Sequence, residues 1–249
     1  MTASRLLPIV IAVFATTACD TVEFQSAPDE PLADCDAALV GDWLITDLRE
    51  GPRTDGRQYL RVDSGCERWF TVAVERKADG SEEIEVDDLE EDLVLGFART
   101  STQAFIAARD RPKDGDANSP SQDKPDGYTL VAWDRHEDAS ITLRLVDLRK
   151  TSHLIIDGKV PGWVEKRDRR ADGSRDGYVS THWAFVFGSA AEVRTLLEAH
   201  DLLDAPWMRL EPTDAQDSAQ INAWLAGAPA VQPEGHAPGE RDSGRRVAR

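Results

Sequence analysis

The sequence predicts a mainly β fold, either an antiparallel barrel or a sandwich, with one C-terminal helix packed on it. Short runs rich in β-branched and aromatic residues alternate apolar with polar side chains, which is the period of half-buried strands. Asp-Gly pairs separate several of these runs, and this dipeptide tolerates the positive φ of tight hairpin turns. A chain of 249 residues that is 41% hydrophobic suits one domain with flexible ends, or two very small domains.

The first 18 residues (1–18) have the pattern of an export signal peptide. Arg5 supplies a positive charge, and the apolar run 6–15 (LLPIVIAVFA) follows it. About ten apolar residues are too few to cross a bilayer, which needs about 20, but they fit the hydrophobic region of a signal peptide. Small residues then lead to Cys19, which resembles the bacterial lipobox, with Thr16 where that motif has Leu or another aliphatic residue.

The resemblance to the lipobox implies that Cys19 is lipidated, with palmitate in its anchor, and becomes the new N-terminus of a bacterial lipoprotein. Two or more acyl chains anchor a protein stably in a membrane, whereas one binds only marginally. The implied location is the cell envelope. Asp20 resembles an inner-membrane retention signal, although the motif does not decide between the inner and the outer membrane. The alternatives are an ordinary signal peptide cut near Ala18 and a buried core helix.

Composition divides the rest of the chain. Residues 19–34 are expected to be the lipidated cysteine and a tether, because the stretch SAPDEPLAD is polar and contains proline. The β domain is expected over 35–212. Residues 213–249 are expected to be a largely disordered tail, because they hold too few apolar side chains to offset chain entropy.

The chain has three cysteines, Cys19, Cys35 and Cys66. An odd count in an exported protein requires an explanation, and lipidation of Cys19 leaves Cys35 and Cys66 as a disulfide pair, which an oxidising compartment permits. Such a bridge would stabilise the fold by about 3–4 kcal/mol. Two separate reduced thiols are the alternative.

Strands are predicted where the two-residue alternation is strongest, and an exposed loop is predicted over 109–127, which has almost no apolar side chain. The predicted strands are 59–62, 69–74, 128–133, 141–146, 153–156 and 177–187.

Residues 189–203 predict a helix. Ser189 and Glu192 have the spacing of a capping box. The apolar side chains that recur at helical intervals and should lie on the β core are Val193, Leu196 and Leu197.

The β domain resembles a lipocalin at two places. Gly41-Asp42-Trp43, just before the first predicted strand, is similar to the Gly-x-Trp signature of that family. There the glycine allows a close turn and the tryptophan closes one end of the barrel. A helix after the last long strand, 181–187, also matches lipocalin order. The whole layout resembles a group of uncharacterised bacterial lipoproteins, which implies a fold and a cellular location but no activity.

Tryptophans mark several of the predicted strands. Core packing is one interpretation, because each ring buries a large area. Lining an apolar ligand pocket is the other, and the tryptophans in question are Trp43, Trp69, Trp133 and Trp183.

Charge and motifs exclude several classes. A net charge of −17 disfavours nucleic acid as a partner. No Gly-x-Ser-x-Gly motif is present, and a helix cap explains Ser189, so we expect no enzyme. The histidines are scattered. Asp114, Asp116 and Asn118 alternate as in a calcium loop, but Gly and Glu are missing at its sixth and twelfth positions. We therefore expect neither a metal nor another cofactor.

Residues 82–92 (EEIEVDDLEED) carry eight acidic side chains in eleven. Ile84 and Val86 alternate with them, so one exposed strand face is the simpler interpretation, and a docking surface for a basic partner is the other.

Two functional hypotheses result. The first is a non-catalytic, membrane-tethered lipocalin-like domain with a small apolar ligand in its barrel. The second is an interaction or structural lipoprotein that binds another envelope protein through its acidic face or its long loop.

Overall fold

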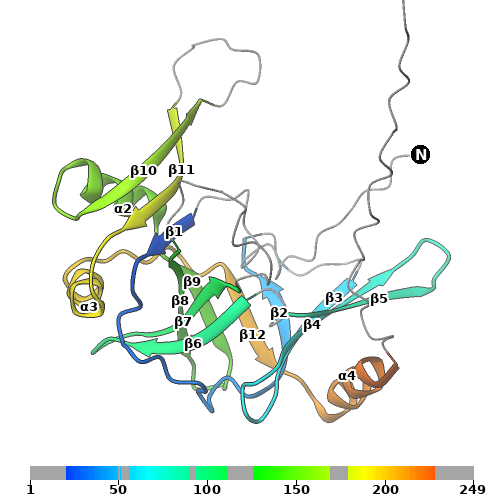
Figure 1. Cartoon of the computed structure of the whole chain (residues 1–249). Coiled ribbons are helices and arrows are strands. Elements are labelled where there is room, and N and C mark those ends of the chain that lie inside the picture. The colour runs from blue at the N-terminus through cyan, green and yellow to red at the C-terminus, as the bar shows by residue number, and fades with distance from the viewer. Residues whose placement is uncertain are drawn as a thin grey trace, which may run out of the picture.

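The structure, a computed structural model, is mainly β, and Figure 1 shows its elements. It describes residues 21–49, 51, 56–89, 93–111, 126–168 and 179–227. Its elements in chain order are β1 Thr21–Phe24, β2 Gly41–Asp47, β3 Gly56–Val62, β4 Trp69–Arg76, β5 Glu82–Asp88, β6 Leu93–Arg99, β7 Ala104–Asp110, β8 Tyr128–Arg135, β9 Ile141–Leu145, α2 Leu148–Ile156, β10 Gly162–Asp168, β11 Val179–Val186, α3 Ala190–Ala199, β12 Met208–Pro212 and α4 Ala215–Gly227.

The described strands form one 12-stranded sheet that does not close on itself. Its main path runs β10-β11-β1-β8-β9-β12-β2-β3-β4-β5, and β6 and β7 branch from β8. All neighbours in this sheet are antiparallel except β1 and β11, which are parallel. The predicted fold class is confirmed, since this arrangement fits a sandwich or an open barrel that carries a C-terminal helix.

The first strand corrects the prediction of a tether over 19–34. β1 lies inside the sheet, between β8 and β11. Its Val22 and Phe24 side chains are 4% and 0% exposed, because the alternation in Thr-Val-Glu-Phe turns both toward the core. Residues 21–24 therefore belong to the folded domain and not to a tether.

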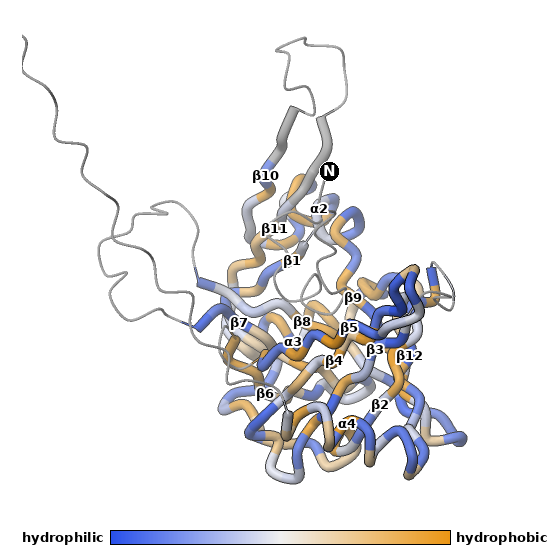
Figure 2. The backbone as a smooth tube through the Cα atoms, turned by 90° about the vertical axis from the view of Figure 1, so that its right-hand side faces the viewer, coloured by the Kyte–Doolittle hydropathy of each residue, from blue (hydrophilic) through white to orange (hydrophobic). Residues whose placement is uncertain are grey.

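The strands enclose two main hydrophobic cores, and Figure 2 shows hydrophobic residues, in orange, along many of the strands. The first core gathers side chains of β2, β3, β4, β9 and β12 with parts of β6, β7 and β8. The second lies where β1, β8 and β11 meet α2 and α3. Most of these strands contribute buried side chains to a core, whereas β5 has no buried residue.

The helix predicted over 189–203 is confirmed as α3, which is shorter. The Ser189 hydroxyl accepts the backbone N–H of Glu192 at 3.4 Å, and the Glu192 carboxylate accepts the backbone N–H of Ser189 at 2.8 Å. Val193 and Leu196 are buried in the second core. The capping box thus fixes where this helix begins.

The prediction of a strand over 153–156 is wrong, because these residues form the end of α2. Asp147 precedes this helix, and its carboxylate accepts the backbone N–H of Lys150 at 2.9 Å. Leu154 and Ile155 pack on the second core. A run as short as His-Leu-Ile-Ile, with three apolar residues, fits either period, and the N-cap upstream selects the helix.

The prediction of a largely disordered tail over 213–249 is wrong for its first part. Residues 215–227 form α4, and residues 228–249 lie outside the described part of the chain. The Asp214 carboxylate begins this helix by accepting the backbone N–H groups of residues 216 and 217, each at 2.8 Å. Ile221, which is 0% exposed, attaches α4 to β3 and β4 through a third cluster, on which Trp224 and Leu225 of α4 also pack.

Ile221→Ala should lower the free energy of unfolding by about 2–4 kcal/mol, because it leaves a cavity against Tyr59, Val72 and Val74. Urea unfolding followed by circular dichroism measures the change. Gln216→Ala, an exposed substitution in the same helix, should leave stability nearly unchanged. Equal stability of both variants would mean that α4 does not dock on the sheet.

Candidate functional site

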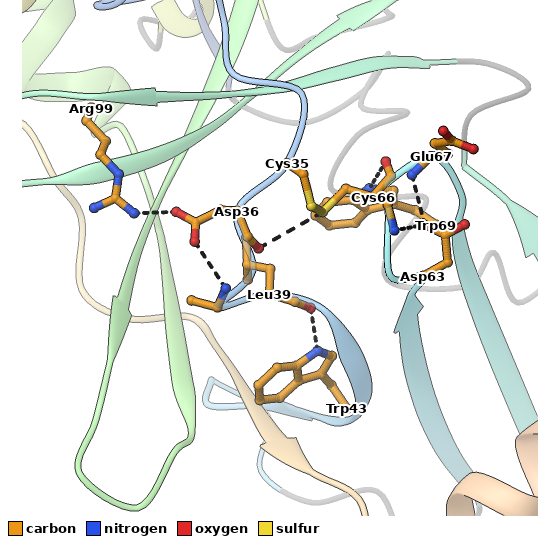
Figure 3. The surroundings of a disulfide bond; sticks show 11 residues. Cys35, Asp36, Leu39, Trp43, Asp63, Cys66, Glu67, Trp69 and Arg99 are labelled. Carbon is orange, nitrogen blue, oxygen red and sulfur yellow. Dashed lines mark hydrogen bonds and ion pairs between the residues drawn. A yellow bond between two sulfur atoms is a disulfide. The ribbon is translucent and has the colours of Figure 1, made fainter.

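A disulfide between Cys35 and Cys66 ties the segment before β2 to the turn between β3 and β4, as Figure 3 shows. Their Cα atoms lie 5.1 Å apart and the residues are separated by 31 positions in sequence. The predicted pairing is confirmed. Its closed loop restricts the unfolded chain, which is worth about 3–4 kcal/mol of stability in the chain-entropy model.

Asp63 builds the turn that presents Cys66. Its carboxylate Oδ1 accepts the backbone N–H groups of Gly65 at 3.2 Å and Glu67 at 2.8 Å. Its carbonyl oxygen accepts the N–H of Cys66 at 3.0 Å. Cys66 has a φ of 54°, which is uncommon for a residue other than glycine. The side chain of Asp63 therefore holds the backbone that places the Cys66 sulfur opposite Cys35.

The disulfide segment is also fastened to β6. Ala33 and Phe97 exchange two backbone hydrogen bonds of 2.9 Å each. The Asp36 carboxylate forms an ion pair with the Arg99 guanidinium. Three segments that are distant in sequence thus meet at one corner of the first core.

Two of the four predicted pocket tryptophans lie at this corner with their indole N–H groups satisfied. Trp43 donates to the carbonyl oxygen of Leu39 at 2.8 Å, and Trp69 donates to that of Cys66 at 3.2 Å. The rings of Trp69 and Phe97 stack with centroids 5.9 Å apart. Trp43 and Trp69 are 4% and 1% exposed, so they serve as core side chains here.

Trp133 belongs to the same core, but its indole N–H group, unlike those of Trp43 and Trp69, has no hydrogen-bond partner. The indole N–H groups of Trp133 and of Trp207 are buried without a hydrogen-bond partner in the described part of the chain. A buried donor that lacks an acceptor costs free energy. The Arg99 guanidinium lies 5.7 Å from the Trp133 ring centroid, which is within the range of a cation–π contact.

A polar network borders Trp133 at the β8–β9 edge of this core. The Arg144 guanidinium donates to the Asp134 carboxylate at 2.6 Å and to the Gln103 side-chain oxygen at 2.8 Å. The Gln103 amide nitrogen donates to the carbonyl oxygen of Trp133 at 2.8 Å. The network fixes the backbone beside the unsatisfied indole and presents no nucleophile.

Trp183 lies apart from the other three. It belongs to β11, where its ring centroid is 5.2 Å from that of Trp163 and 5.8 Å from that of Phe185. The structure therefore brings together Trp43, Trp69 and Trp133 and places Trp183 in a separate aromatic group. Their role as ligand-pocket lining stays a prediction.

Several other predicted positions lie outside the described residues, namely Cys19, most of the loop 109–127 and the alternating oxygen donors at 114–118. Within the described ranges, no group of three or more histidine, cysteine or acidic side chains could hold a metal ion. In that same part of the chain, no helix has the length and apolar character needed to cross a membrane.

Residues 82–88 of the acidic segment form the exposed edge strand β5, as one interpretation predicted, and residues 90–92 lie outside the described part of the chain. Glu83, Glu85 and Asp87 alternate along one face, and Glu83 lies directly opposite Glu75 of β4. Partial desolvation, followed by repulsion from Asp87, Glu75 and Glu83, raises the pKa of the Glu85 carboxyl. Charged residues on an edge strand also discourage pairing with other chains.

Residues that the sequence analysis missed are Trp163, Phe187 and Trp207. Trp163 and Phe187 are 42% and 41% exposed. The two-residue spacing of aromatic rings in HWAFVF is a signal for one shared strand face. The position of Trp163 beside that face depends on the β10–β11 register, which no local signal reveals.

Comparisons with protein-family models, curated proteins and solved structures returned no match to this chain.

Glu85→Gln should raise the free energy of unfolding at pH 7, by about 0.3 kcal/mol, because solvent screens most of the repulsion at an exposed strand. Since the folded state raises the pKa of Glu85, its protonation favours folding. That stabilisation is complete below the unfolded pKa and is lost as the pH rises through the folded pKa. The difference between variant and wild type should therefore vanish at acidic pH.

Urea unfolding at a series of pH values checks this prediction. Glu137→Gln is the matched control, because it removes the same charge from an exposed turn distant from β5. A gain that persists unchanged in acid would contradict repulsion as the cause.

Proposed function

We propose that this chain is a lipid-anchored protein of the bacterial cell envelope, attached through Cys19, whose β domain acts by binding and not by catalysis. The observation that carries the proposal is the position of β1, which begins at Thr21. Cleavage before Cys19 would leave every described element intact. An acylated N-terminus would then stand immediately beside the sheet.

The disulfide supports the same cellular location. Disulfides persist in exported proteins and are rare where thiols are kept reduced. The Cys35–Cys66 bridge uses both remaining cysteines, so Cys19 is the one thiol left for acylation. The envelope is thus the compartment that accounts for all three cysteines together.

Cys19→Ser should move the protein from the membrane fraction to the supernatant and abolish incorporation of an alkyne-labelled fatty acid. Thr16→Leu, which restores the aliphatic residue of the lipobox, should increase the processed fraction. Fractionation with intact mass measurement of the N-terminal peptide tests both. Membrane retention of the serine variant, or an unmodified Cys19 in the wild type, would reject the anchor.

A small apolar ligand with one hydrogen-bond acceptor is the first candidate for what the domain binds. The buried, unsatisfied indole N–H groups of Trp133 and Trp207 favour it, because an acceptor on a ligand would remove their desolvation cost. The alternative is an envelope protein that meets the acidic face of β5. This face carries concentrated negative charge, which attracts a basic partner.

Native mass spectrometry of the protein purified from its own organism separates these candidates. A bound small molecule should add a discrete mass, and Trp133→Phe should lose most of it because the indole donor is gone. Trp224→Phe, a substitution in α4, is the matched control and should keep the ligand. The mass of the bare chain would reject the ligand, and a protein partner would appear as a larger complex.

A further inference from the structure

Four aromatic rings form a continuous row along β10 and β11. Trp163 contacts Trp183, whose ring lies next to Phe185, and the Phe185 and Phe187 centroids are 5.2 Å apart. The strand register places Trp163 directly opposite Phe185. The row therefore spans both strands on one face of this hairpin.

This face is the one turned away from α2. A Cβ atom built on Gly162 would lie 2.8 Å from the Ile155 side chain of α2, so Gly162 faces the helix and its neighbour Trp163 faces the other way. On β11, Ala184 and Val186 pack in the second core, which also contains Ile155. α2 therefore packs on the face of this hairpin opposite to the aromatic row.

The two ends of the row are exposed. Large apolar side chains this exposed are few in the described part of the chain, and Trp163 and Phe187 are the two aromatic ones. The middle rings, Trp183 and Phe185, are 7% and 0% exposed. Exposed apolar side chains that form one continuous patch can mark an interaction surface, and here buried rings connect the two exposed ones.

The row lies next to the start of the folded domain. β1 pairs with β11 so that Thr21 is opposite Trp183 and Glu23 is opposite Phe185. Cys19 is two residues before Thr21, and a chain of that length spans at most about 7 Å. An acyl chain on Cys19 therefore enters a bilayer within a few ångströms of β1, beside the aromatic row.

Charge selects the kind of bilayer. The register puts Glu23 and Glu165 on the same face as the rings, because they lie opposite Phe185 and Trp183. The whole chain has a net charge of −17. This net negative charge repels anionic headgroups, whereas indole and phenyl rings favour the boundary between headgroups and acyl chains.

We propose that the exposed rings of Trp163 and Phe187 contact a zwitterionic phospholipid bilayer, so that the domain lies against the membrane in one fixed orientation. The inference rests on the proposed lipidation of Cys19, which supplies the anchor beside these rings. The bilayer then shields Trp163 and Phe187 from water. The β3–β5 end, with α4, lies on the other side of the domain from this hairpin (Figure 1), so it would face away from the bilayer.

The test uses the mature protein on phosphatidylcholine vesicles whose acyl chains are brominated near the headgroup. Bromine quenches tryptophan fluorescence at short range. We expect quenching in the wild type and loss of most of it in Trp163→Phe. Trp224→Phe, the matched removal of a tryptophan in α4, should leave it in place. Replacing half of the phosphatidylcholine by phosphatidylglycerol should weaken binding of an unacylated sample.

The mass of the N-terminal peptide reports acylation separately. An acylated protein whose quenching is the same in Trp163→Phe and wild type overturns the aromatic contact and leaves the anchor standing. An unacylated Cys19 rejects the anchor; Trp163-dependent quenching would then still support the surface, and its absence would overturn it. A concentration-dependent blue shift without vesicles, removed by Trp163→Phe, would assign the surface to a second copy and overturn the proposal.

Discussion

The pairing of β1 with β8 and β11 is the constraint on which the rest of this fold depends. β1 has only four residues, yet it connects the β10–β11 hairpin to the remaining strands of the sheet. Val22 and Phe24 enter the second core beside Ala184 and Val186. Without this strand, β11 would keep only β10 as a sheet neighbour among the described strands, and a two-stranded hairpin is only marginally stable by itself.

A second set of constraints acts at the first core, beside the disulfide. The disulfide, the Ala33–Phe97 bridge and the Asp36–Arg99 ion pair fasten one short segment to β6 and to the β3–β4 turn. These contacts hold the peptide between β1 and β2 in place along its length. The N-terminal part of the domain is thus attached at both ends, which explains why a stretch with linker-like composition is ordered here.

Local pattern predicted the elements that local physics controls. β3, β4, β8 and β9 follow their two-residue alternation, and α3 follows its capping box. The disulfide followed from the number of cysteines. The failures share a different cause. β1 depends on partners in β8 and β11, α4 depends on a site for Ile221 in the third cluster, and residues 153–156 had an apolar pattern with two interpretations. The grouping of three tryptophans and the exposure of Trp163 likewise depend on how distant strands pair, which the local sequence does not reveal.

The parallel pairing of β1 with β11 also limits the order in which the strands of this sheet can pair while the chain is being synthesised. A chain synthesised from its N-terminus holds β1 without either sheet neighbour until β8 and later β11 have been made. Pairings this distant in sequence are slow to form. The segment Thr21–Phe24 therefore lacks its sheet partners during most of synthesis, and Glu23 places a charge between the apolar side chains of Val22 and Phe24, which opposes aggregation of the unpaired strand. The N-terminal strand is the first part of the domain to be synthesised and one of the last to be secured.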